Sequence, residues 1–243
     1  MRISINQPEI FATIFEKVTK TKLLQPITGI SNDSREIREG DLYIALKGEK
    51  VDGHKFIIQS KKAGAHAALV MNTNYKVDLQ QITTDKPIDT IGKIANKWRK
   101  RFKIPIIGIT GSNGKTSTKD LLSHVLSSKY NVHATKGNFN TIIGVPLTLL
   151  EIDNKHDISI IEMGASVPGE ITNLCNIAEP THGLITNIAP AHLEGFGSIE
   201  TIAYEKGALF RYLKKGLSFV NTTDKMVSTI SFKGKRKTYG LNP

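Results

Sequence analysis

Cysteine is almost absent from this sequence, since Cys175 is the only one in 243 residues. A single thiol excludes an internal disulfide and a zinc site made of several cysteines. Long apolar runs are also missing, because no stretch reaches the roughly 18 residues that a membrane-spanning helix needs. The start of the chain, MRISINQPEIFATIF, has neither an unbroken apolar core nor a small-residue cleavage site, which argues against a signal peptide. We therefore expect a cytoplasmic protein.

Acidic residues are in the minority, with 22 Asp and Glu against 33 Lys and Arg and a formal net charge of +11. Nucleic acid is one partner that suits a basic surface. However, the lysines are scattered, and the aromatic residues, 7% of the chain, do not interleave with them. Small polyanions such as nucleotides suit the same charge, so we expect no nucleic-acid partner. The densest basic run, Lys233 to Lys237, is predicted to be a solvated turn.

The strongest pattern in the sequence lies between Ile104 and Ser128. The run IPIIGIT predicts a buried strand, GSNGKTS predicts a glycine-punctuated loop, and a helix is expected from about Lys115 onward. A phosphate-binding loop has this order, because glycines let backbone N–H groups turn toward an anion and the helix N-terminus adds its positive end. The candidate nucleotide-binding residues are Gly111, Ser112, Asn113, Gly114, Lys115, Thr116 and Ser117.

Two side chains of this loop carry the expected chemistry. Lys115 is placed to contact the outer phosphates of a nucleotide, and the Thr116 hydroxyl is placed to bind a phosphate-bound Mg²⁺. The general pattern has a glycine six residues before the lysine, and Ile109 stands there instead. A purely structural turn is the alternative, but the flanking strand and helix favour nucleotide binding.

The alternation of strands and helices predicts an α/β fold. From Ile106 onward this alternation indicates a mostly parallel sheet with crossover helices. Residues 1–103 predict a smaller α/β unit, with strands at 42–46 and 67–71 and helices at 54–65 and 88–102. Because proline cannot continue a helix, Pro105 favours a boundary there. We expect an N-terminal domain at 1–103 and a P-loop central domain at 104–243.

Further candidate residues follow the predicted strands of the central domain. Glu162 ends an apolar strand, where a carboxylate is costly unless it is paired or binds a metal; a side chain that points to water is the alternative. His192 is either a structural histidine or a metal or phosphate contact, and Lys206 by default is a surface lysine. Because ligands gather at the carboxyl ends of parallel strands, we expect the P-loop, Asn138, Asn140, Glu162 and His192 to lie at one edge of the sheet.

Several motifs taken together resemble the Mur ligase family. They are GSNGKTS, GNFNTIIGVPLTLL, IEMGA and NIAPAHLEGFGS, in this order, and SNDSREIREGDLYIALKGEKVDGHKFI resembles the family's N-terminal domain. Within the family, Asn-Phe-Asn-Thr and Ala-His-Leu-Glu favour the ligases that add D-alanyl-D-alanine to UDP-N-acetylmuramoyl-tripeptide over the sister ligases that add the third peptide residue. The resemblance also implies a third domain, so the chain is expected to be truncated before it, with an incomplete central domain.

The resemblance implies roles for individual residues. Lys115 and Thr116 would serve ATP and its Mg²⁺, and Glu162 and His192 would serve the metal sites. Lys206 matches the lysine that the family carbamoylates to form a metal bridge. Catalytic roles therefore fall to Lys115, His192 and Lys206, and metal-binding roles to Thr116, Glu162, His192 and Lys206. The expected substrate-binding residues are Asp33, Ser34, Arg35 and Lys47 for the UDP-sugar, and Asn138, Asn140 and Thr141 for the muramoyl-peptide.

The reaction implied by the resemblance is ATP-dependent amide-bond formation in peptidoglycan precursor synthesis. ATP would convert a carboxylate to an acyl phosphate, and the amine would then displace phosphate, with Lys115 and Mg²⁺ stabilising the developing charge. We expect a monomer that uses ATP and Mg²⁺, and we expect the 243-residue chain alone to be inactive. The alternatives are the sister ligase, a shortened non-catalytic protein that binds nucleotide or UDP-sugar, and another P-loop enzyme such as a kinase or GTPase.

Overall fold

The computed structural model describes residues 1–48, 51–72, 76–191 and 193–241. The chain divides into two compact units. Met1–Arg101 with Leu149–Glu151 forms one, here called the N-terminal unit, and Phe102–Thr148 with Ile152–Pro243 forms the other, here called the central unit. The boundary expected from the sequence, after residue 103, lies slightly later in the chain. Within the described ranges, no helix is both long enough and apolar enough to cross a membrane.

The N-terminal unit is built on a five-stranded sheet in the order β1-β2-β3-β4-β5. β1 runs antiparallel to β2, and the other neighbours are parallel. The strands are β1 Arg2–Ser4, β2 Gly29–Ser31, β3 Asp41–Ile44, β4 Ala67–Val70 and β5 Gln80–Thr83. The helices are α1 Pro8–Thr19, the 3-10 helix η1 Gly53–Phe56, α2 Ile57–Lys62 and α3 Pro87–Arg99.

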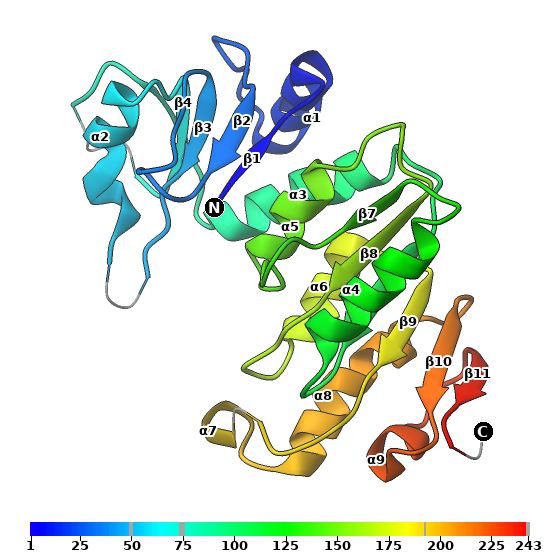
Figure 1. Ribbon diagram of the computed structural model, residues 1–243. Coiled ribbons are helices and arrows are strands. Elements are labelled where there is room, and N and C mark those ends of the chain that lie inside the picture. Colours follow the sequence, from blue (N-terminus) through cyan, green and yellow to red (C-terminus); the bar gives the residue numbers. More distant parts are fainter. Residues whose placement is uncertain (49–50, 73–75, 192, 242–243) are drawn as a thin grey trace. The chain divides into compact units, whose positions relative to one another are not determined.

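α1 and α3, the two long helices of this unit, begin with proline. Proline suits the first turn of a helix because an N–H at that position has no partner within the helix. The two helices pack against each other (Figure 1). The expected helix at 54–65 is split into η1 and α2, because the Asp52 carboxylate accepts from the His54 N–H and starts a tighter turn. α1, β1, β2 and β5 are not predicted from the sequence. β1 and β2 have only three residues each, and β5 begins with two glutamines, so none of these strands shows the apolar run that marks β3 and β4.

The central unit is built on a six-stranded sheet in the order β11-β10-β9-β6-β8-β7, and its neighbouring strands are parallel. This confirms the predicted parallel sheet. The strands are β6 Ile106–Thr110, β7 Val132–Ala134, β8 Ile158–Glu162, β9 His182–Ile185, β10 Leu217–Asn221 and β11 Lys235–Tyr239. The helices are α4 Lys115–Leu126, α5 Gly144–Leu150, α6 Glu170–Ala178, α7 Leu193–Phe196, α8 Ile199–Tyr212 and α9 Lys225–Ser228.

Helices cover both faces of this sheet, with α4 on one face and α6 and α8 on the other (Figure 1). β6 and β8, two of the strands between these helices, are mostly apolar and buried, which is the pattern expected of parallel strands covered on both sides. The order of the strands reverses at β6, which lies between β8 and β9. Ile109 pairs with Glu162 of β8, and Thr110 pairs with Ile185 of β9. The carboxyl ends of these three strands therefore lie together.

The basic run at Lys233 to Lys237 is not a turn, and that prediction is wrong. Residues 235–237 belong to β11, which pairs with β10 from Leu217–Lys235 to Asn221–Tyr239. The strand lies at the sheet edge and all five of its residues are exposed. Charged side chains are common on such edges because they discourage pairing with another chain. A strand of this composition has no hydrophobic alternation, so the sequence does not predict it.

Candidate nucleotide- and metal-binding site

Two glycines shape the loop between β6 and α4. Gly111 has φ +149°, and a Cβ there would lie 1.9 Å from the Thr186 hydroxyl. Gly114 has φ +75° and caps the start of α4. Both positions need glycine because L side chains rarely adopt these conformations. The loop therefore runs close to the end of β9 and leads directly into a helix N-terminus, as a phosphate-binding loop does.

The segment after β9 holds the loop in place. The Ser112 N–H donates to the Asn187 carbonyl at 2.9 Å, and the Ser112 hydroxyl donates to the Ala189 carbonyl at 2.8 Å. The Asn113 N–H donates to the Asn187 side chain at 3.0 Å, and the Thr186 hydroxyl donates to the Asn113 carbonyl at 2.6 Å. No local sequence pattern predicts these contacts, because they join segments more than 70 positions apart in the chain.

Lys115 lies on the inner side of the loop and is partly buried. Its ammonium group donates to the Gly111 carbonyl at 2.8 Å and to the Ser112 carbonyl at 3.1 Å. Burial lowers the pKa of Lys115, and the Glu162 carboxylate opposes that shift. The amine is thus held against two carbonyl groups of the loop, beside the N-terminus of α4.

Glu162 is the centre of the polar cluster at the strand ends. It is 1% exposed, and its Oε1 accepts from the Asn140 amide at 2.7 Å and from the Thr116 hydroxyl at 3.2 Å. Its Oε2 is buried without a hydrogen-bond partner among the residues that the structure describes. A buried carboxylate oxygen without a hydrogen-bond donor costs free energy. A bound cation at Oε2 would offset that cost.

A second layer of contacts fixes Glu162. The Glu162 N–H donates to the Thr135 hydroxyl at 3.0 Å, and the ammonium group of Lys119 donates to the Thr135 carbonyl at 2.7 Å. Lys119 is only 3% exposed although it lies on α4. The Asn140 carbonyl also accepts from the Gly164 N–H at 2.8 Å. Lys119 and Thr135 are absent from the sequence-based candidates, because a lysine on a mostly polar helix gives no sign of burial.

Lys206 is not the surface lysine that its sequence context favours by default. It is 2% exposed on α8, and burial lowers its pKa to about 8, with the charge of Lys115 acting in the same direction and Glu205 opposing it. The neighbouring Glu205 is also buried, and its carboxylate accepts from the Gly169 and Ile171 N–H groups, both at 2.7 Å. Glu205 therefore anchors the start of α6 beside Lys206.

A hollow of 180 Å³ brings these parts together. It is lined by Ser112, Lys115, Asn140, Thr141, Gly164, Ala165, Ser166, Glu170, Ala191 and Lys206. Of the expected muramoyl-peptide residues, Asn140 and Thr141 therefore lie at the hollow, whereas the exposed Asn138 does not line it. Ser117 is exposed on the first turn of α4. His192 lies outside the described residues.

The residues present fit a Mg²⁺ ion. The Thr116 hydroxyl and the Glu162 carboxylate would offer it two oxygen ligands, and Mg²⁺ commonly takes its remaining ligands from phosphates and water. In the described part of the chain, no group of three or more His, Cys, Asp and Glu residues is arranged to hold a metal.

A short segment before β8 matches a guanine-reading pattern, and its position in the fold decides whether it could serve the P-loop. Residues 154–157, Asn-Lys-His-Asp, have the Asn-Lys-x-Asp pattern with which GTPases read guanine. They precede β8, whereas the P-loop follows β6. Because β6 and β8 are parallel, the two segments lie at opposite ends of the sheet, and this match does not support a GTPase.

The N-terminal unit has a hollow of its own, with a volume of 640 Å³. Asp33, Ser34 and Arg35 line it, together with Asn32, Tyr43 and other residues, but Lys47 does not. Arg35 donates to Asp33 at 2.6 and 2.9 Å, and these hydrogen bonds lower the pKa of Asp33 to about 2. The Asn32 Oδ1 is buried without a hydrogen-bond partner in the described ranges, so it can accept a bond from a ligand.

The fold and the loop define the central unit as a P-loop α/β domain. The Mur ligase middle domain matches residues 109–242, and the catalytic domain of the Mur ligase family, so described, matches residues 26–98. The chain belongs to the Mur ligase family.

Its relatives include UDP-N-acetylmuramoyl-tripeptide–D-alanyl-D-alanine ligases. The enzyme of Synechocystis sp. is 40% identical, over 88% of this chain and 49% of the relative. That of Escherichia coli is 36% identical, over 89% of this chain and 48% of the relative. The chain therefore spans about half the length of the curated relatives it matches.

Solved structures agree with this placement. MurF from Acinetobacter baumannii superposes with a TM-score of 0.87 at 29% identity, covering 94% of this chain and 53% of that one. MurF ligase from Thermotoga maritima, solved in complex with ADP, gives a TM-score of 0.78 at 32% identity, covering 88% of this chain and 50% of that one.

Proposed function

We propose that this chain carries the nucleotide- and UDP-sugar-binding part of a cytoplasmic ligase that adds D-alanyl-D-alanine to UDP-N-acetylmuramoyl-tripeptide. The reaction would use ATP and Mg²⁺ and serve peptidoglycan precursor synthesis. The names of the relatives support the substrates, and the ADP complex of the Thermotoga enzyme supports the nucleotide.

The observation that carries the proposal is the buried Glu162 carboxylate at the mouth of the P-loop. Its Oε2 has no donor among the described residues, while its Oε1 is fixed by Asn140 and Thr116. Glu162 and Thr116 would hold Mg²⁺, which when bound neutralises charge that develops on the transferred phosphoryl group. Lys115 would add a second positive charge close to the loop N–H groups.

Lys206 would act as a metal ligand after carbamoylation. Its lowered pKa leaves a larger neutral fraction of the amine near neutral pH than an exposed lysine has, and only a neutral amine adds to carbon dioxide. His192 is proposed for the same metal region on the basis of sequence alone. Asn140 and Thr141 would contact the muramoyl-peptide at the hollow they line.

The hollow of the N-terminal unit would bind the uridine-diphosphate end of the substrate. Its exposed Arg35 offers a positive charge to the diphosphate, and the buried Asn32 Oδ1 offers an acceptor to a uracil N–H or a ribose hydroxyl. Asp33 and Ser34 would shape the turn that presents Arg35, since the Asp33 carboxylate accepts from the Arg35 N–H at 3.0 Å.

Calorimetric titration of ADP, with and without Mg²⁺, tests the nucleotide site directly. We expect Mg²⁺ to strengthen ADP binding by the 243-residue chain, and we expect Glu162→Gln to abolish that gain because it removes the charge facing the metal. Lys115→Ala should weaken ADP binding in both conditions. Exposed residues provide matched controls, Glu200→Gln and Lys129→Ala. A Mg²⁺ effect that survives Glu162→Gln would contradict the metal assignment.

Ligation needs a separate assay, because the relatives' activity belongs to chains about twice this length. Phosphate release and product formation would be measured with UDP-N-acetylmuramoyl-tripeptide and D-Ala-D-Ala, with and without the remaining half of a relative. We expect ligation only with that half, because the acyl phosphate and amine must meet in a site closed to water. Nucleotide binding without ligation under either condition would favour a non-catalytic binding protein.

A further inference from the structure

A second hollow of the central unit lies at the end of the sheet opposite the P-loop. It has a volume of 710 Å³ and is lined by residues 180–182, 212–217 and Lys235. These segments precede or begin β9, β10 and β11. The P-loop follows β6, which is parallel to β9. The second hollow is therefore separate from the nucleotide site, and an inference about it does not rest on the proposed function.

The floor of this hollow is tightly packed. Leu213 is 2% exposed, and a Cβ on Gly216 would lie 2.4 Å from the Thr181 carbonyl oxygen. A Cβ on Gly234 would lie 2.3 Å from the Leu213 carbonyl oxygen. Gly216 thus lets the turn before β10 close onto the residue before β9, and Gly234 lets the segment before β11 close onto the end of α8. The hollow is a consequence of this packing and not of a loose surface loop.

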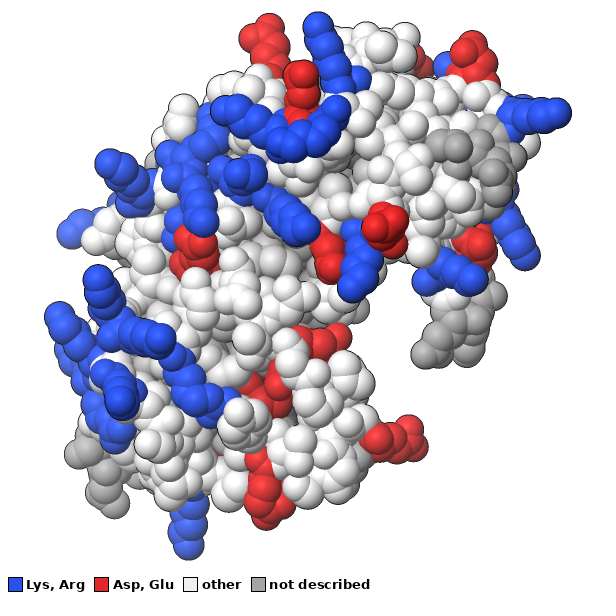
Figure 2. Space-filling model, turned by 180° about the vertical axis from the view of Figure 1, so that it is seen from behind, with Lys and Arg blue, Asp and Glu red and all other residues white. Residues whose placement is uncertain are grey.

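Positive charge dominates the rim. Residues 212–241 contain seven Lys and Arg but only one acidic residue, Asp224. Asp224 is already engaged, since its carboxylate accepts from the Ile188 and Val227 N–H groups. Figure 2 shows basic side chains gathered at the end of the central unit that holds β10 and β11. Within the described part of the chain, neither Lys215 nor Lys235 forms an ion pair.

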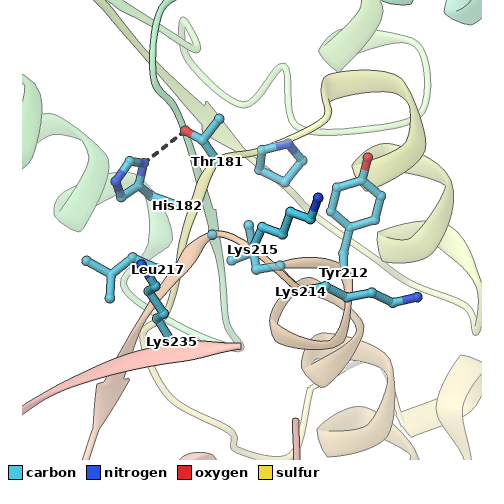
Figure 3. Close-up of a pocket in the computed structure, with 10 residues that line it drawn as sticks. Thr181, His182, Tyr212, Lys214, Lys215, Leu217 and Lys235 are labelled. Carbon is cyan, nitrogen blue, oxygen red and sulfur yellow. Dashed lines mark hydrogen bonds between the residues drawn. The ribbon is translucent and has the colours of Figure 1, made fainter. Parts of the chain in front are cut away.

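The lining groups combine charge with hydrogen-bond donors. Figure 3 shows Lys215 extending in the same direction as the Tyr212 ring and Lys235 projecting toward His182, while Lys214 turns away. The backbone N–H groups of Lys215 and Gly216 have no protein acceptor among the described residues. Both N–H groups are thus available to an acceptor from a ligand, and they lie next to the Lys215 ammonium group in the chain.

We propose that this hollow binds a small polyanion of the phosphate-ester class, held by the Lys215 and Lys235 ammonium groups and by the N–H groups of the Lys215–Gly216 turn. Two lysines from different strand ends match a ligand with at least two anionic groups. The buried Leu213 floor and the Tyr212 ring suit an organic group attached to the phosphate. A concave site of this size fits a small molecule, whereas a lipid surface would contact the exposed edge strand β11 instead.

The test uses inorganic pyrophosphate as the probe and the 243-residue chain carrying Lys115→Ala, which weakens the P-loop as a competing site. Amide chemical shifts would be followed during the titration. We expect shifts confined to residues 181–182, 214–217 and 235. The double variant Lys215→Gln/Lys235→Gln should bind about tenfold more weakly, a difference of about 1.4 kcal/mol. Both lysines are exposed, so the variant should fold.

The matched control is Lys129→Gln/Lys155→Gln, which removes the same charge from exposed positions elsewhere on the central unit. It should bind pyrophosphate within about twofold of the parent. An equal loss in both double variants would show general charge attraction and overturn the proposal, as would a spectrum that pyrophosphate leaves unchanged. A parallel arm uses phosphatidylcholine vesicles with and without phosphatidylglycerol. Binding to the anionic vesicles without a response to pyrophosphate would assign the patch to a lipid surface and also overturn the proposal.

Discussion

The buried histidine of β7 predicts a specific dependence of stability on pH. His133 is 6% exposed, its Nδ1 lies 2.8 Å from the Ser159 hydroxyl, and its ring meets His156 at 5.0 Å. Burial lowers the pKa of His133 from 6.5 to about 3, with the charges of His156 and Lys136 acting in the same direction and Asp153 opposing them. His133 is therefore neutral in the folded protein at every pH well above 3.

The sign of the effect follows from which state binds the proton. Below pH 6.5 the unfolded chain protonates this histidine and the folded chain does not, so stability falls as the pH falls. The loss approaches about 1.4 kcal/mol per pH unit and reaches about 2 kcal/mol between pH 8 and pH 5. It continues until the pH nears the folded-state value of about 3.

The assay compares the protein with His133→Gln, whose amide does not titrate. Trp98, the only tryptophan, lies in the N-terminal unit, so its fluorescence does not follow this region. Unfolding in urea would instead be followed by hydrogen exchange of peptides from β7 and β8 at pH 8, 7, 6 and 5. The variant should lose less stability on acidification by about 2 kcal/mol. Parallel pH curves for the two proteins would refute the reasoning, and His124→Gln on the exposed face of α4 is the control.

Three further substitutions test the site's supports. Gly111→Ala should abolish ADP binding measured by calorimetry, because its Cβ would collide with the Thr186 hydroxyl and its φ of +149° disfavours alanine; unchanged affinity would contradict the loop geometry. Lys119→Met should destabilise the central unit to urea by about 1–3 kcal/mol, because it removes the donor to the buried Thr135 carbonyl; Lys129→Met should have little effect. Glu205→Gln should cost a similar amount, about 1–3 kcal/mol, since each carboxylate oxygen accepts from one N–H group at the start of α6 and the amide nitrogen of glutamine would face one of them as a second donor. Increased exchange of the α6 peptide would localise that loss, and unchanged exchange would argue against the anchoring role.

Much of the central unit was predictable from local sequence. An apolar strand, a glycine loop and a helix are adjacent in the chain between Ile104 and Ser128, so the P-loop depends on neighbouring residues only. The alternation of strands and helices likewise predicts a parallel sheet. The basic strand β11 shows the limit of this reasoning, since an edge strand of lysine, arginine and threonine gives no hydrophobic signal and is defined by its pairing with β10.

The site itself depends on contacts that no local pattern contains. Sequence reasoning nominates Glu162 because it ends an apolar strand, but only the register of β6 with β8 places it beside Thr116. The burial of Lys119 and Lys206 depends on what packs over α4 and α8, because helical spacing cannot distinguish a charge in water from one enclosed by neighbouring segments.

The sequence by itself determined the family, the α/β class and the position of the phosphate-binding loop, because each is encoded in residues that are close along the chain. The tertiary structure alone decided which oxygen of Glu162 has no donor among the residues that the structure describes, which lysines are desolvated, and where the second hollow lies. Burial and hydrogen bonding in a folded protein are set by groups that are distant in sequence and close in space, and the free energy of a charged side chain depends on those neighbours more than on its own type.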